Sequence, residues 1–138
     1  MKVLVLTTSY PRYEGDPTVH FLGEAVAKLR ERGLEVEVVS PQSFQHFGIA
    51  YGAGVMGNLR RHPWRTAFVP PMLANFRRAA RGDASDADLV HAHWLPTGLV
   101  AASLGKPFVL TVHGTDLELA RRAPSVARWV LPKARLVI

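Results

Sequence analysis

The chain begins with a short apolar run that has no polar alternation. Residues 3–7 read Val-Leu-Val-Leu-Thr, which is typical of a strand buried on both faces of a parallel sheet. Apolar residues then recur at helical spacing (Val19, Leu22, Val26 and Leu29), and a second strand is expected over residues 36–40. Strand, helix and strand in this order form a βαβ unit, whose crossover is right-handed. The sequence therefore predicts an α/β, Rossmann-like doubly wound parallel sheet.

Turn-forming residues predict where the first helices begin and end. Asp16 is the expected N-cap of the first helix, Pro17 its first helical residue and Gly33 its stop. Residues 42–64 contain four glycines without clear periodicity, so we expect a long loop with room for a short helix. A helix that opens at Pro70 and Pro71 is expected to close at Gly82.

The second half of the chain repeats the alternation of strands and helices. Strands are expected at residues 89–93 and 108–112, with a short helix over 96–104 capped by Gly105. Helical sequence then ends near residues 131–132, and a fifth strand starts at 136–138. Because the sequence stops inside this apolar run, we expect residues 1–138 to be one truncated domain.

Composition limits the compartment and the classes of partner. The chain has no cysteine, which excludes disulfides and thiolate metal sites and fits a reducing cytoplasm. The first apolar run is shorter than a signal-peptide core, and charged residues or prolines interrupt every other apolar stretch. We therefore expect a cytoplasmic protein whose membrane contact, if it has any, is peripheral.

The formal charge of +6 is largely due to arginine. Without interleaved aromatic residues or a recognition motif, the arginines are interpreted as a solvated face, and no nucleic-acid partner is expected. The same side chains would form the patch that meets anionic lipid: Arg60, Arg61, Arg65, Arg77, Arg78 and Arg81.

The loops that follow the first, third and fourth expected strands are the candidate sites, because ligands of an open parallel sheet bind beyond the carboxyl ends of its strands. The first loop, residues 8–18, precedes a helix N-terminus, which favours a phosphate or another anion. It has neither the G-x-G-x-x-G nor the G-x-x-x-x-G-K arrangement. A plain connecting loop is therefore an equal alternative.

Three histidines lie at or near the ends of the third and fourth strands. Alternation places His91 and His93 on one face and Trp94 on the other. His93 is expected to reach a ligand, whereas His91 is interpreted as a core residue bonded to the backbone. His113 titrates near neutrality and can donate to a hydroxyl or a phosphate oxygen, and Asp116 is expected to cap the next helix rather than orient His113. The alternative is a zinc site made by the three histidines, as in metal-dependent hydrolases.

Four blocks of sequence occur in order at these strand ends. They cover residues 7–21, 29–41, 88–98 and 106–116, and include T-T-S-Y-P-R, D-L-V-H-A-H-W and K-P-F-V-L-T-V-H-G-T-D. Together they resemble the N-terminal domain of the family 4 type of retaining glycosyltransferases with a GT-B fold. The resemblance covers nearly all of the chain. It departs at Val19, where many relatives carry glycine.

The resemblance implies an enzyme in which two Rossmann-like domains face a cleft. The N-terminal domain holds the acceptor, and a C-terminal domain, absent from this sequence, holds the nucleotide-diphosphate sugar. His113 would be the catalytic residue beside the transferred sugar. The implied substrate-binding residues are Gly15, Asp16, Thr18, His20, His93, Gly114, Thr115 and Asp116. No metal or cofactor is expected, because helix dipoles and basic side chains of the second domain would offset the charge of the leaving diphosphate.

The predicted function is hexosyl transfer with retention to a sugar, a lipid-linked acceptor or a small molecule. Acceptor choice is expected to lie in residues 42–64, and this half alone is expected to be inactive. The alternative from another class is a non-catalytic binding module or partner subunit that supplies an acceptor site to another chain.

Overall fold

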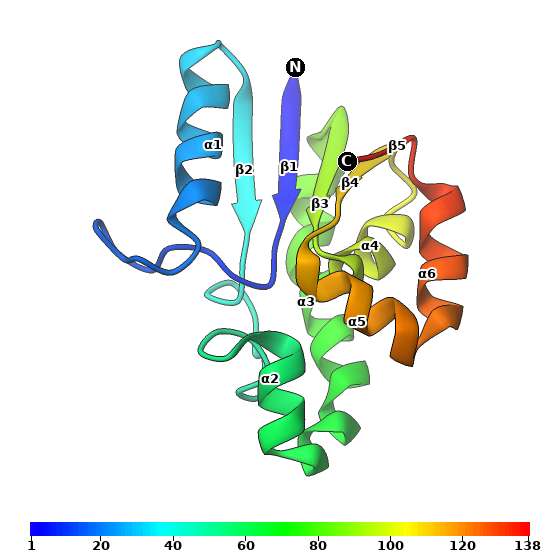
Figure 1. Ribbon diagram of the computed structural model, residues 1–138. Helices are drawn as coiled ribbons and strands as arrows, with labels where there is room; N and C mark the ends of the chain where they lie inside the picture. Colours follow the sequence, from blue (N-terminus) through cyan, green and yellow to red (C-terminus); the bar gives the residue numbers. More distant parts are fainter.

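Five parallel strands form the centre of the computed structural model, which describes residues 1–138 (Figure 1). They are β1 (Lys2–Leu6), β2 (Glu35–Val39), β3 (Leu89–His93), β4 (Phe108–Thr111) and β5 (Leu136–Val137). Their order in the sheet is β2-β1-β3-β4-β5, and every pairing is parallel. The chain thus winds outward from β1 in both directions, which confirms the predicted Rossmann-like α/β fold and puts the switch point between β1 and β3.

The two faces of the sheet are buried by different helices. On one face, α1 (His20–Glu31) packs its Val26 against Val3, Val5 and Val36. The other face carries the larger core, where Leu4 and Leu6 of β1 meet residues of α3 (Val69–Asp86) and α4 (Leu95–Ala102). Because alternate residues of β1 serve opposite faces, the strand is apolar and buried from Val3 to Leu6, as its sequence predicts.

Helix α1 starts later than its sequence predicts. Its N-cap is Val19, in the left-handed region with φ 53°, and Asp16 is not its cap. The carboxylate of Asp16 instead accepts the backbone N–H of Thr18 two residues on, which turns the chain before the helix begins. The predicted stop is correct: Gly33 has φ 83° and its N–H donates to the carbonyl of Arg30.

The segment between β2 and β3 contains the predicted short helix and a longer one than predicted. The short helix is α2 (Gly54–Arg61), and the 3-10 helix η1 (Pro63–Phe68) leads from it into α3. Gly82 does not end α3, which continues to Asp86. Ala84, one turn after Ala80, is buried in the same core, so packing carries the helix past the glycine.

The last helical region is divided into three parts. Helices α5 (Gly114–Arg122) and α6 (Pro124–Val130) separate at Ala123, and the 3-10 helix η2 (Leu131–Lys133) follows. Helix α6 lies so close to α4 that a Cβ on Gly98 would be 2.5 Å from Cγ1 of Val130. A glycine is therefore required at this crossing.

No helix of the structure combines the length and the apolar composition that a membrane span requires.

Candidate functional site

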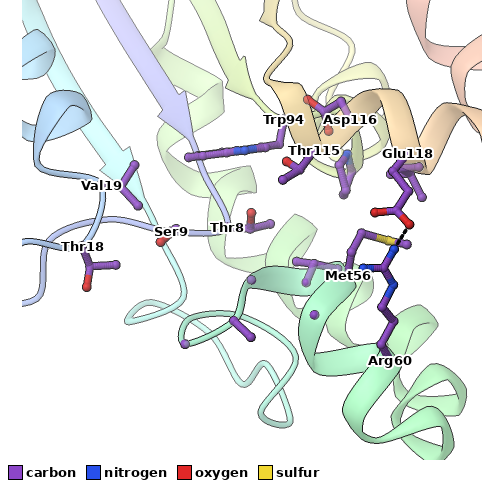
Figure 2. Close-up of a pocket in the computed structure, with 17 residues that line it drawn as sticks. Thr8, Ser9, Thr18, Val19, Met56, Arg60, Trp94, Thr115, Asp116 and Glu118 are labelled. Carbon is purple, nitrogen blue, oxygen red and sulfur yellow. Dashed lines mark ion pairs between the residues drawn. The ribbon is translucent and has the colours of Figure 1, made fainter.

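A cavity of about 390 Å³ opens at the carboxyl ends of the strands (Figure 2). Its lining comes from the loop after β1, from the start of α2 and the turn before it, and from the starts of α4 and α5. The lining residues are Thr8, Ser9, Thr18, Val19, Gly52, Ala53, Gly54, Val55, Met56, Gly57, Arg60, Trp94, Pro96, Thr115, Asp116, Glu118 and Leu119. The cavity therefore lies where a doubly wound sheet binds its ligands.

One side of the site is a stack of aromatic rings, which we call the histidine wall (His91, His93, Trp94, His113 and the adjoining Asp116). The ring centroids of His91 and His93 are 4.2 Å apart, and those of His93 and His113 are 5.7 Å apart. The ring of Trp94 stacks on His113 at 4.3 Å with an interplanar angle of 26°. Since Trp94 also lines the cavity, the stack connects the interior of the sheet with the ligand space.

Asp116 joins the two turns that carry this wall. The residue is 5% exposed; its Oδ2 accepts the backbone N–H of His113 at 2.9 Å and its Oδ1 that of Leu95 at 2.9 Å. Each of these N–H groups lies at the start of a helix, α5 or α4, and has no partner within its helix. The capping role predicted for Asp116 is correct, but the N-cap position itself belongs to His113.

Trp94 has the most unusual backbone of the wall. Its φ of 72° lies in a region that L-residues rarely adopt. Its N–H still donates to the carbonyl of Thr111, and α4 begins with the next residue. Because the chain turns here, Trp94 does not continue the alternation of β3 as predicted, and its ring lies 6.2 Å from that of His93.

The histidines of the wall are neutral at pH 7. Burial lowers the pKa of His93 to about 3, with smaller contributions from the neighbouring His91 and His113. Burial also lowers the pKa of His91 and of His113, although the charge of Asp116 opposes the second shift. Burial raises the pKa of Asp116, against the two N–H groups it accepts. Nδ1 of His93 and Nε2 of His113 are buried without a partner, and neither residue lines the cavity itself.

The loop after β1 is fixed from inside by Asp16. This buried carboxylate accepts the backbone N–H groups of Arg12 and Thr18, and Nε of Arg12 is 3.0 Å from its Oδ2. Hydrogen bonds from Thr18 and Arg12 hold the pKa of Asp16 well below its usual range. Asp16 therefore shapes the loop, while the neighbouring Thr18 faces the cavity.

The opposite side of the site is formed by residues 52–60, which we call the glycine wall. Nδ2 of Asn58 donates to the carbonyls of Ile49 and Tyr51, which folds the preceding turn against α2. An ion pair between Arg60 and Glu118 crosses from α2 to α5 at the cavity, where Figure 2 draws it as a dashed line. No residue of α2 is buried, so this wall is attached through a few polar contacts.

The predicted site residues fall into three groups. Thr18, Thr115 and Asp116 line the cavity, and His93 and His113 belong to the histidine wall. The other four lie outside the lining: Gly15 is an exposed turn residue with φ 82°, Asp16 is buried within its loop, and His20 and Gly114 are exposed first residues of α1 and α5.

The zinc arrangement considered for the three histidines is not formed. No group of three or more potential ligand side chains is placed so that it could hold a metal ion. His91 is half-buried, and its Nε2 lies 2.8 Å from Oγ1 of Thr111, so its partner is a side chain rather than the predicted backbone. The histidines are therefore stacked on one another instead of converging on a point.

Several lining residues were not identified individually from the sequence. Residues 42–64 were expected to govern acceptor choice, yet Met56 and the glycines of the glycine wall had no assigned role, and Arg60 was assigned only to the lipid patch. The end of β2 could have indicated these residues. The carboxyl ends of all strands in a parallel sheet lie at one edge, so the segment after β2 borders the same site. Trp94 and Glu118 could be placed only from the tertiary structure.

Comparison with known proteins agrees with this architecture. The family model described as Glycosyltransferase Family 4 matches residues 19–138. The match includes the glycine wall and the histidine wall, whereas Gly15, Asp16 and Thr18 precede it. No curated protein shows significant similarity to the chain. Since the matched region includes most of the sequence, the protein belongs to glycosyltransferase family 4.

Proposed function

We propose that this chain is the acceptor-side domain of an enzyme that transfers a hexosyl group, with retention, from a nucleotide-diphosphate sugar to a hydroxyl acceptor. The observation that carries the proposal is the cavity at the β1/β3 switch point with the neutral histidine wall at its edge. Membership of the family supports sugar transfer in general. The donor class, the retention and the hexosyl group are our inferences from the sequence blocks.

The lining suits a hydroxylated acceptor. Four side-chain hydroxyls face the cavity (Thr8, Ser9, Thr18 and Thr115), beside the indole of Trp94. Hydroxyls both donate and accept hydrogen bonds, and an indole face provides an apolar platform for a sugar ring. The small residues of the glycine wall leave room on the opposite side. A sugar, free or lipid-linked, fits this chemistry better than a flat apolar ligand does.

His113 is the proposed catalytic group. Its imidazole is neutral because burial lowers its pKa, and its Nε2 has no protein partner. A neutral imidazole can bond a hydroxyl of the transferred sugar without adding a positive charge beside an anomeric carbon that itself becomes positive in the transition state. His93 has the same neutral character and is proposed to bond the acceptor side.

The other half of the reaction needs groups that this sequence does not contain. We propose that a C-terminal Rossmann-like domain supplies the nucleotide site and the positive charge that stabilises the leaving diphosphate. No metal or cofactor is required in this scheme. A cytoplasmic location is proposed because nucleotide sugars would be available there.

The proposal is tested in the protein that carries both domains. His113→Ala is expected to lower kcat about 100-fold, the scale of losing one positioned polar group, with little change in KM for the acceptor. His62→Ala, an exposed histidine outside the cavity, is the matched control and should retain activity. The product's anomeric configuration is read by NMR spectroscopy.

Three results would contradict parts of the proposal. Unchanged turnover of His113→Ala would remove its catalytic role, and an inverted product would remove retention. Failure of the two-domain protein to consume any nucleotide-diphosphate sugar, with acceptor sugars still shifting the resonance of the Trp94 indole, would instead favour the binding-module alternative.

A further inference from the structure

The net positive charge of the protein arises from one segment of the chain. Residues 38–82 contain six arginines and no aspartate, glutamate or lysine, and they therefore account for the whole formal charge of +6. In the rest of the chain, eleven basic residues balance eleven acidic ones. Such separation gives the segment a strong positive potential of its own.

Large aromatic side chains are exposed within the same segment. Trp64 of η1 is 62% exposed and Phe68 is 36% exposed, and their rings meet edge to face at 5.9 Å. The guanidinium of Arg65 lies over the Trp64 ring at 5.3 Å. The premise that the arginines lack neighbouring aromatic residues is therefore wrong at Arg65, although the other arginines of the segment are exposed as expected of a solvated face.

Trp64 and Phe68 are not part of the hydrophobic core, although the ring of Phe68 also meets that of Phe47 at 5.2 Å. Neither α2 nor η1 has a buried residue and neither has an acidic residue in its first turn. Figure 1 shows α2 at the end of the molecule to which the arrowheads of β1 and β2 point, beyond the sheet. Exposed tryptophan and phenylalanine beside arginine, at a projecting end, are costly in water and indicate a partner surface.

We propose that Arg61, Trp64 and Phe68 form a docking surface for an anionic lipid bilayer, while Arg65, whose Nη1 donates to the carbonyl of Gly48, holds the Trp64 ring in place. Arginine pairs with lipid phosphates, while tryptophan prefers the region between headgroups and acyl chains. The surface lies apart from the histidine wall, and the proposal stands whether or not the proposed transfer reaction is correct.

The geometry favours a bilayer over a nucleic acid. Single-stranded nucleic acids stack their bases on open aromatic faces. Here Trp64 and Phe68 are nearly perpendicular, at 88°, and Arg65 covers one face of Trp64. The two rings therefore form a compact apolar projection bordered by arginine. Such a projection suits insertion at the boundary between lipid headgroups and acyl chains.

Docking would also orient the cavity. Arg60, which directly precedes Arg61 on α2, is paired with Glu118 and lines the cavity, so the cavity adjoins the docking surface. An acceptor presented at the bilayer surface would then reach the site without leaving the lipid headgroup region.

Vesicle co-sedimentation with the 138-residue chain tests the proposal. Vesicles with about 30% phosphatidylglycerol in phosphatidylcholine should bind the protein at low salt, and binding should be lost near 1 M salt, where charges are screened within about 3 Å. Trp64→Ser should weaken binding about tenfold through lost apolar burial. Arg61→Gln should weaken it about fivefold.

The chain offers matched controls on other helices. Trp129 of α6 is 47% exposed and has Nζ of Lys133 4.6 Å from its ring centroid, and Arg121 of α5 is exposed. Trp129→Ser and Arg121→Gln should leave vesicle binding unchanged.

Four results would overturn the proposal: no binding to anionic vesicles at low salt, equal binding to pure phosphatidylcholine, equal losses in the control variants, or Trp64-dependent binding of single-stranded DNA in place of vesicles.

Discussion

The two sides of the candidate site are built by different physical means. The histidine wall consists of buried or half-buried rings at strand ends, and one buried carboxylate, Asp116, fixes both of its turns. The glycine wall has no buried residue in its helix and is joined to the opposite side by the Arg60–Glu118 ion pair. Local stability follows buried contacts and satisfied hydrogen bonds, so the two walls should open with very different free energies.

This difference suggests a division of labour. Groups that act on the reacting atoms must be held to a fraction of an ångström, which the histidine wall provides. A wall attached through few contacts can change its shape or sequence without disturbing the sheet, and so suits the selection of acceptors. The bulky residues Phe47 and Tyr51 in the preceding turn have positive φ, which indicates that this turn is maintained at some cost.

The largest effect is expected from breaking the histidine wall. Asp116→Ala leaves the N–H groups of His113 and Leu95 without a partner in a buried place, and should lower the free energy of unfolding by about 3 kcal/mol. Chemical denaturation measures the change. Asp83→Ala, at an exposed position of α3, is the control and should change stability by less than about 0.5 kcal/mol. A loss below about 1 kcal/mol for Asp116→Ala would show that the two turns are held by other contacts.

The next effect is a pH dependence that belongs to the histidine wall. His93 has a folded pKa of about 3 against 6.5 when unfolded, so the unfolded chain binds the additional proton between these values. Its contribution to stability is therefore complete above the unfolded pKa and is lost as the pH falls below it. The loss is at most about 1.4 kcal/mol per pH unit for each such histidine.

Urea unfolding between about pH 7 and pH 5 measures this slope. In His93→Gln the slope should be smaller by about that amount, whatever the variant's stability at pH 7. His20→Gln, at an exposed position, is the control and should keep the slope of the unchanged protein. An identical slope in His93→Gln would contradict the depressed pKa of His93.

The smallest global effect is expected from loosening the glycine wall. Arg60→Gln removes the contact between α2 and α5, and because both partners are partly exposed the free energy of unfolding should fall by no more than about 0.5 kcal/mol. Hydrogen exchange should nevertheless become faster in α2 and stay unchanged in β3 and β4. Arg122→Gln, which breaks only the pair with Glu118 inside α5, is the matched control. Equal exchange in α2 for both variants would remove the bridging role of Arg60.

Much of the fold could be predicted from the sequence, because the strands and helices of the sheet depend on local patterns. The apolar run of β1, the valine-rich segment of β2, the helical spacing of α1 and the stop at Gly33 are each visible within a few residues, and all are confirmed. The wrong predictions have two causes. Asp16 bonds within its own loop, to residues two and four positions away, whereas tertiary packing of Ala84 carries α3 past Gly82.

What the sequence by itself determined is the doubly wound sheet, the strand ends that carry His93 and His113, and the family. Only the tertiary structure decided that Trp94 stacks on His113, that Asp116 joins two helix starts, and that the segment after β2 closes the cavity. The physical reason is distance along the chain. Burial periodicity and turn chemistry act between near neighbours, whereas each of these contacts joins residues about 20 or more positions apart, whose meeting depends on the order of strands in the sheet.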